Sequence, residues 1–220
     1  MNLKLKAEID AIKWWHRIDL GDGVITPGTT DSEEKLRRLH LPEDLTGKSV
    51  LDVGAWDGWW SFLCERRGAS AVTAVDTWCF DTGRRGFDLA TRVLNSKVVG
   101  IKLDVHDLDP DLLGKYDFVL CLGALHHFQN PLLALQKLHS VCKGKLILET
   151  HLDWIFKEEP ICSFYDKNKP YGDPTCLWGP NPPCVESWLK FASFNDAHMV
   201  SIKYKPANWS GDRGVFHALA

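Results

Sequence analysis

A glycine-containing turn after an apolar stretch is the first feature of this sequence that could do chemistry. The turn lies in VLDVGAWDGWW, residues 50–60, where Asp52 precedes Gly54 and Gly58. Glycine allows a backbone to turn sharply and to approach a ligand closely. The pattern therefore predicts either a ligand-binding loop or a structural turn between a strand and a helix.

Carboxylates at the ends of the next two apolar stretches favour the ligand-binding interpretation. Asp76 follows Asp52 by about 20 residues, where a carboxylate can accept hydrogen bonds from two ribose hydroxyls. Asp104 ends a third stretch and could receive an adenine amino group. The carboxyl ends of parallel strands meet at one edge of a sheet, so these acids predict a nucleoside site.

Four further side chains that could exchange protons follow the fourth and fifth predicted strands: His126, His127, Glu149 and His151. A histidine with an ordinary pKa is a suitable general base at neutral pH. Adjacent residues of an extended chain point to opposite sides, so we expect only one of the paired histidines to face an acceptor. We favour His126 slightly, because it is nearer the strand end, with His151 as the competing base.

The elements that must position these residues alternate between strands and helices from residue 48 onward, which is typical of a parallel sheet with helices on both faces. A helix and two strands follow, and the two strands should form an antiparallel pair joined by the polar loop KPANWSGDR. We therefore predict an α/β, Rossmann-like sheet of seven strands. The predicted strands are 49–54, 70–76, 97–104, 116–123, 145–150, 199–204 and 214–219, and the helices are 59–68, one within 84–95, 130–144 (ending at Gly144) and 184–194.

Residues 151–183 are rich in Pro, Gly, Trp and Cys and show no clear period. One interpretation is a hydrophobic cover for the edge of the sheet. The other is a substrate lid, whose aromatic side chains would stack on a planar or sugar-like acceptor. The residues that would contact a substrate are Trp154, Tyr165, Tyr171, Trp178 and Asn181.

The successive segments VLDVGAWDG, AVD, LDV and YDFVLCLGALHH resemble the motifs of class I S-adenosylmethionine-dependent methyltransferases. The loop of that family reads acid-x-Gly-x-Gly-x-Gly, and here Trp56 stands at the middle glycine. The resemblance implies S-adenosyl-L-methionine as the cofactor. It places these residues around it: Asp52, Gly54, Ala55, Trp56, Gly58, Asp76, Thr77, Trp78, Asp104, Val105, Leu122 and Gly123.

A dinucleotide fold would instead require Gly-x-Gly-x-x-Gly and a pyrophosphate at the helix N-terminus. Asp57 lies beside that N-terminus and would repel a pyrophosphate, whereas a cationic sulfonium tolerates a nearby acid. This favours the methyl donor over NAD.

Three longer segments, at 14–28, 122–151 and 177–181, are similar to the bacterial tRNA wobble-uridine (5-carboxymethoxyuridine) methyltransferase-like family. That similarity implies an N-terminal segment folded over the cofactor, with Trp15, His16 and Ile25 in contact with it. In the carboxymethyl-transferring branch a lysine upstream of the loop holds the carboxylate of the donor. Lys35 falls in roughly that place, but its neighbours EEKLRR do not match, and we do not assign it this role.

Composition limits the partners. The 26 basic and 29 acidic residues nearly balance at a formal charge of −3, so there is no global attraction to nucleic acid. The sequence also begins without the long N-terminal region of the tRNA enzymes, a second reason to expect a small-molecule substrate.

No apolar run is long enough to cross a bilayer, and no compact metal-ligand motif is present. The seven cysteines form no C-x-x-C pair, and this cysteine pattern favours a reducing cytoplasm.

We therefore expect one methyltransferase domain over residues 1–220, with an N-terminal cap at 1–47 and a substrate lid at 151–183. The predicted activity is methyl transfer from S-adenosylmethionine to an oxygen or nitrogen of a small metabolite or natural product. One alternative is a tRNA wobble-uridine methyl or carboxymethyl transferase. The other is a catalytically silent cofactor-binding module, suggested by Trp56. The oligomeric state stays open.

Overall fold

The chain forms two compact units in the computed structural model, which describes residues 3–30, 32–78, 81–166, 172–203 and 212–220. The first unit comprises Met1–Arg37 and Pro42–Asp104, and the second comprises Arg38–Leu41 and Val105–Ala220. Helix α2, Ser32–Leu39, lies at the change from one to the other.

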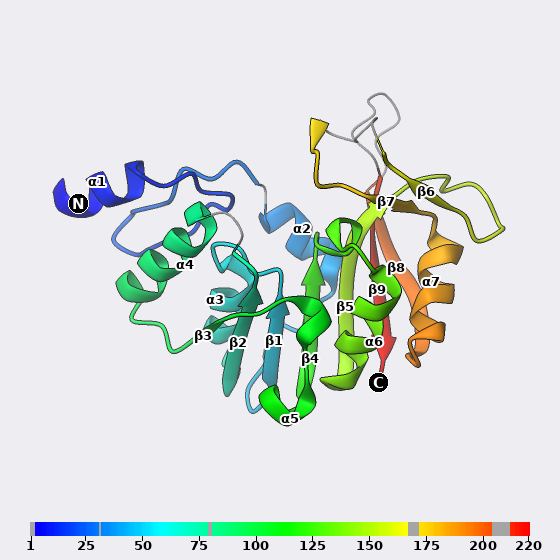
Figure 1. Cartoon of the computed structure of the whole chain (residues 1–220). Helices are drawn as coiled ribbons and strands as arrows, with labels where there is room; N and C mark the ends of the chain where they lie inside the picture. Colours follow the sequence, from blue (N-terminus) through cyan, green and yellow to red (C-terminus); the bar gives the residue numbers. More distant parts are fainter. Residues whose placement is uncertain (1–2, 31, 79–80, 167–171, 204–211) are drawn as a thin grey trace. The chain divides into compact units, whose positions relative to one another are not determined.

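The first unit has three parallel strands in the order β3-β2-β1 (Figure 1). Four of the five residues of β1 are buried, as expected for a parallel strand covered on both faces. Helix α3 ends as its sequence predicts, because Gly68 follows it with a φ of +85°. The elements are α1 (Leu3–Asp10), β1 (Ser49–Val53), α3 (Trp59–Arg66), β2 (Ala71–Asp76), α4 (Asp81–Val93) and β3 (Val99–Lys102).

The second unit has four strands in the order β4-β5-β9-β8 (Figure 1). Strands β4 and β5 are parallel, whereas β9 runs antiparallel to both β5 and β8. Its main elements are α5 (Pro110–Leu113), β4 (Tyr116–Leu122), α6 (Pro131–Ser140), β5 (Cys142–Leu152), α7 (Pro182–Phe191), β8 (Asn195–Lys203) and β9 (Asp212–Leu219). Two 3₁₀ turns, η1 (Val105–Asp107) and η2 (Leu125–His127), complete its core.

Asparagine caps and prolines begin both long helices of the second unit. The Asn130 side chain accepts a hydrogen bond from the Leu133 amide at 3.1 Å, and Pro131 occupies the first turn of α6. Asn181 and Pro182 start α7 in the same way. Both starts could be predicted from the sequence because caps are local interactions.

The first unit has three strands and the second has four. Together they confirm the predicted seven-stranded, Rossmann-like fold with an antiparallel last pair. The sequence did not reveal α1, α2 and α5, nor a small second sheet in which β6 (Cys162–Phe164) pairs antiparallel with β7 (Trp178–Pro180). These two short strands lie within the segment predicted as a lid. Most of the predicted loop KPANWSGDR lies outside the described residues.

The prediction that α6 extends to Gly144 was wrong. The helix ends at Ser140, and Gly144 lies inside β5. A Cβ atom on Gly144 would stand 2.3 Å from the carbonyl oxygen of Asp117 in the neighbouring strand. This glycine therefore permits the close approach of β4 and β5 beside an irregularity in their register.

No helix of the described ranges is long and apolar enough to cross a membrane. Six cysteines in those ranges carry free thiols.

Gly144→Ala should lower the free energy of unfolding by about 1–3 kcal/mol, because the new methyl group meets backbone that cannot rotate away. Urea denaturation measures this change. Lys143→Ala is the control from the same strand; it removes only a partly exposed ion pair with Asp117 at 3.4 Å and should cost less than about 1 kcal/mol. Equal stability of both variants and the wild type would contradict this role of Gly144.

Candidate functional site

The loop after β1 turns through three residues with left-handed backbone conformations. Gly54, Trp56 and Gly58 have φ values of +79°, +51° and +88°. Trp56, which stands at the middle glycine of the family pattern, therefore adopts a conformation that favours glycine. A non-glycine residue adopts it at a cost of about 1–2 kcal/mol, so other contacts must hold it in place.

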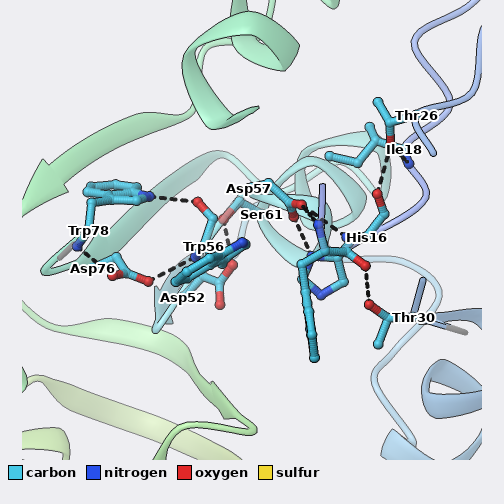
Figure 2. Close-up of polar contacts among 11 residues, drawn as sticks. His16, Ile18, Thr26, Thr30, Asp52, Trp56, Asp57, Ser61, Asp76 and Trp78 are labelled. Atoms are coloured by element: carbon cyan, nitrogen blue, oxygen red, sulfur yellow. Dashed lines mark hydrogen bonds and ion pairs between the residues drawn. The ribbon is translucent and has the colours of Figure 1, made fainter. Parts of the chain in front are cut away.

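Those contacts come from the end of β2. The amide of Trp56 donates to Oδ2 of Asp76 at 2.9 Å, and the indole of Trp78 donates to the carbonyl of Trp56 at 2.7 Å (Figure 2). A Cβ atom on Gly83 would lie 3.0 Å from the Trp56 ring, which places this indole against α4. Replacing the glycine thus keeps the turn and adds an aromatic contact.

Asp76 is positioned at the loop as predicted, and it also holds the loop. Its second oxygen accepts from the amide of Trp78 at 2.7 Å. Burial raises the pKa of Asp76, while the amides of Trp78 and Trp56 act in the opposite direction. Each carboxylate oxygen can accept more than one hydrogen bond, so ribose hydroxyls could still bind here.

Asp57 fastens the N-terminal segment to this loop. One of its oxygens accepts from the amides of Trp15 and His16 at 2.8 and 3.0 Å, and the other pairs with Nδ1 of His16 (Figure 2). Both side chains are buried. Asp57 therefore ties the N-terminal segment to the loop that is predicted to bind the cofactor.

The other residues of the N-terminal segment differ in their accessibility. His16 is buried with Nδ1 committed to Asp57, whereas Trp15 and Ile25 are both 52% exposed. The hydroxyl of Thr26 donates to the carbonyl of His16 at 2.7 Å, which closes the segment on itself. The ammonium group of Lys35 lies 5.8 Å from the centre of the Trp60 ring.

Asp52 is buried within β1 and points toward α3. It accepts a hydrogen bond from the hydroxyl of Ser61 at 2.6 Å. Burial raises its pKa to about 6, although Ser61 and the charge of His16 oppose the rise. This carboxylate holds the helix to the strand that carries the loop.

The remaining predicted cofactor residues are distributed over both units. The amides of Gly54 and Ala55 donate to the carbonyl of Val75 at 2.8 and 3.3 Å. The others are half-buried or buried residues whose contact with a cofactor stays a prediction: Thr77 and Asp104 in the first unit, and Val105, Leu122 and Gly123 in the second.

In the second unit, the three predicted histidines lie together. The rings of His126 and His127 are 4.1 Å apart, and those of His126 and His151 are 6.1 Å apart. Tyr165, predicted in the lid, joins them at 5.9 Å from His151. No group of three or more possible metal ligands occurs among the described residues.

The favoured base, His126, already uses both ring nitrogens. Nε2 lies 3.2 Å from a guanidinium nitrogen of Arg213, and Nδ1 lies 3.2 Å from the hydroxyl of Thr150. Arginine only donates, and the amide of His151 donates to Nδ1 at 3.4 Å, so both ring nitrogens face hydrogen-bond donors. A proton from an acceptor would have to displace one of these contacts.

Glu149, the other predicted catalytic group at this strand end, is fully buried in a bidentate ion pair with Arg213. Its two oxygens accept from Nε at 2.8 Å and Nη2 at 2.9 Å. This geometry makes Glu149 the anchor of the guanidinium. The sequence held no local signal for Arg213, because only the pairing of β9 with β5 brings it here.

His151 is engaged by two residues of the following segment. Its Nε2 lies 2.9 Å from the hydroxyl of Tyr165 and 3.2 Å from Asp153, and the tyrosine hydroxyl donates to the same carboxylate. Burial acts to raise the pKa of Asp153, but the hydrogen bonds from His151 and Tyr165 outweigh it and lower the pKa. Tyr165 therefore contributes to a polar network as well as offering a ring.

The other predicted lid residues have separate environments. Asn181 is buried and uses its whole amide, accepting from the amides of Ile161 and Cys184 and donating to two carbonyls, which leaves nothing for a substrate. Trp178 donates to the carbonyl of Phe128 at 2.8 Å. Trp154 is 56% exposed and donates to Ser163. Tyr171 lies outside the described residues.

Comparison with known proteins identifies the family. A family model described as "Methyltransferase domain" matches residues 31–180. The chain belongs to this methyltransferase family. Two curated relatives are each 30% identical and are named tRNA U34 carboxymethyltransferase. The one from Campylobacter hominis aligns over 75% of this chain and 56% of its own length, and the one from Pseudomonas fluorescens over 78% and 53%.

This methyltransferase chain thus spans about half the length of the curated relatives it matches. Among solved structures, the N-terminal domain of EvdMO1 with bound S-adenosylhomocysteine has a TM-score of 0.74 at 17% identity, covering 100% of this chain and 98% of that one. The 1,6-didemethyltoxoflavin-N1-methyltransferase of Burkholderia thailandensis has a TM-score of 0.56 at 18% identity, covering 79% and 71%. At such identities the likeness shows the fold, and the family model shows the predicted methyltransferase class.

Asp52→Asn should change how stability depends on pH. The native pKa of about 6 exceeds the ordinary 3.8, so the native state holds this proton more tightly than the unfolded chain. The resulting stabilisation is fully present below pH 3.8 and is lost as the pH rises through about 6. The neutral amide can still accept from Ser61 and has no proton to lose.

The variant should therefore match the wild type near about pH 4 and exceed its unfolding free energy near about pH 7.5 by roughly 2–3 kcal/mol. Urea denaturation at both pH values measures this. A difference between variant and wild type that is the same at both would contradict the assignment.

Proposed function

We propose that this methyltransferase transfers a methyl group from S-adenosylmethionine to an oxygen or nitrogen of a small metabolite or natural product. The observation that carries the proposal is the cluster of His126, His127 and His151, since an O–H or N–H acceptor must lose a proton. His126 and His151 are almost completely buried and His127 is half-buried, so little of the cluster is exposed, which suits a small acceptor better than a large folded nucleic acid.

The cofactor, when bound, supplies an already activated methyl group. The protein must then orient the acceptor and take up its proton. In the first unit, Asp76 and the backbone of the 54–58 loop would hold the nucleoside. In the second unit, the Glu149–Arg213 pair fixes the histidine cluster, and the aromatic rings of Tyr165 and Trp178 would bind the acceptor.

The free thiols of the described cysteines suit a reducing compartment, and we propose a cytoplasmic location on that ground.

A tRNA wobble uridine is the second candidate acceptor. The curated relatives that are 30% identical and carry that name favour it. The near balance of charge over the chain, −3 in total, favours the small molecule.

Cofactor affinity should depend on Asp76. Asp76→Ala should weaken binding of S-adenosylhomocysteine by about 1.5–3 kcal/mol in calorimetry, because it removes charge-assisted hydrogen bonds. Asp88→Asn is the matched control, since Asp88 pairs with Arg84 on the exposed side of α4 in the same unit. Unchanged affinity in Asp76→Ala would remove this residue from the site.

Binding to tRNA should be no stronger than non-specific, with a Kd of about 10⁻⁴ to 10⁻⁶ M near physiological salt. Filter binding over a range of salt concentrations measures this. Nanomolar binding with a steep salt dependence would promote the tRNA candidate.

Methyl-labelled S-adenosylmethionine, incubated with the protein and a panel of sugars, phenols, amines and bulk tRNA, tests the acceptor directly. We expect label in a low-molecular-mass product. Label in tRNA would overturn the proposal, and cofactor binding without any transfer would support the silent module.

A further inference from the structure

His127, the second member of the histidine pair, differs from its neighbours in that only its Nδ1 has a hydrogen-bond partner among the described residues. Its Nδ1 lies 3.0 Å from the hydroxyl oxygen of Thr175. That hydroxyl lies 2.6 Å from Oδ1 of Asp173, which also accepts the Thr175 amide at 2.8 Å. Carboxylate, hydroxyl and imidazole thus form a chain. Among the residues that the structure describes, none hydrogen-bonds to Nε2 of His127.

The direction of this chain follows from the hydrogens available. Burial acts to raise the pKa of Asp173, but the hydrogen bonds from Thr175 outweigh it and lower the pKa, so the carboxylate is ionised and can only accept. Thr175 must therefore give its single hydroxyl hydrogen to Asp173. Its oxygen is left to accept from Nδ1–H of His127, which places the lone pair of the neutral ring at Nε2.

The other two histidines are arranged differently. Both ring nitrogens of His126 face hydrogen-bond donors: Nε2 faces the guanidinium of Arg213, and Nδ1 faces the amide of His151. Nε2 of His151 faces Asp153 and Tyr165. Both rings are also almost completely buried, whereas His127 is half-buried. His127 is therefore the member of the cluster whose unprotonated nitrogen can meet an incoming group.

We propose that Nε2 of His127 is the proton acceptor of the methyl transfer, and that Thr175 and Asp173 are positioning residues that fix its tautomer. This inference rests on the proposed function. The acceptor forms its bond to the methyl carbon while the methyl–sulfur bond breaks and leaves its electron pair on sulfur. The proton of the acceptor O–H or N–H passes to Nε2, and the resulting imidazolium later releases it to water.

The charges around His127 suit this role. Burial lowers the pKa of His127, a hydrogen bond with the Thr175 backbone and the charge of Asp173 act to raise it, and the charges of Arg213 and His151 act to lower it further. The ring is therefore unprotonated at neutral pH and ready to accept. Once it is protonated, Asp173 stabilises the imidazolium through Thr175.

The first experiment reads the tautomer by two-dimensional ¹H–¹⁵N NMR of the imidazole rings in the whole protein, without any acceptor. We expect His127 to carry its proton on Nδ1 near neutral pH, and Thr175→Val to produce a mixture of tautomers. Thr175→Ser keeps the hydroxyl and should restore the wild-type pattern. Asp196→Asn is the matched control, because Asp196 lies beside a different histidine, His198, at the surface.

A proton on Nε2 in the wild type, or a tautomer insensitive to Thr175→Val, would overturn the inference while leaving the proposed function standing. Failure to bind S-adenosylhomocysteine would instead count against the proposed function. The two failures are therefore distinguishable.

The second experiment measures single-turnover rates on the labelled panel compound. His127→Ala should reduce the rate by about 10²–10⁴-fold with unchanged cofactor affinity. Asp173→Asn should lower the rate. It should also move the acidic limb of the pH–rate profile to lower pH, because it removes a charge that raises the pKa of His127. Near-wild-type turnover in His127→Ala, or an unmoved acidic limb in Asp173→Asn, would overturn the proposal.

Discussion

A carboxylate that is buried or partly buried must receive hydrogen bonds or a counter-charge, and this requirement organises both units of the protein. In the first unit, Asp57 accepts hydrogen bonds from the N-terminal segment, and Asp76 accepts one from the loop after β1. In the second unit, Glu149 forms a bidentate ion pair with Arg213, and Asp153 interacts with His151 and Tyr165. In each case the acid is placed by a strand or the turn that follows it, and at least one of its partners lies 12 or more residues away in the sequence.

This arrangement explains how the loop tolerates a tryptophan at the position where the pattern it resembles has glycine. The left-handed conformation of Trp56 costs free energy, but its amide and carbonyl are both bound by groups at the end of β2. The indole also packs against Gly83, which has no side chain to obstruct it. The substitution changes the wall of the loop and leaves its backbone path intact.

In the second unit, three histidines that look equivalent in the sequence become different chemical groups. His126 faces a cation, His151 faces an anion and a phenol, and His127 receives support on one nitrogen only. The Glu149–Arg213 pair is the origin of the first difference, since it holds the guanidinium against His126. Charge pairing between β5 and β9 thus decides which imidazole can act as a base.

The sequence by itself determined the alternation of strands and helices, the glycine turn and the acids at strand ends, because apolar periodicity, helix caps and turn residues are local signals. It also indicated the methyltransferase class and the three histidines. It misplaced the end of α6, because the need for glycine at position 144 comes from the carbonyl of Asp117 in another strand. Only the tertiary structure introduced Arg213, Thr175 and Asp173. It also showed that the side-chain amide of Asn181 is hydrogen-bonded to the backbone. Residue types determine which protons a chain can exchange, but the lone pairs that remain available depend on partners that lie far apart in the sequence.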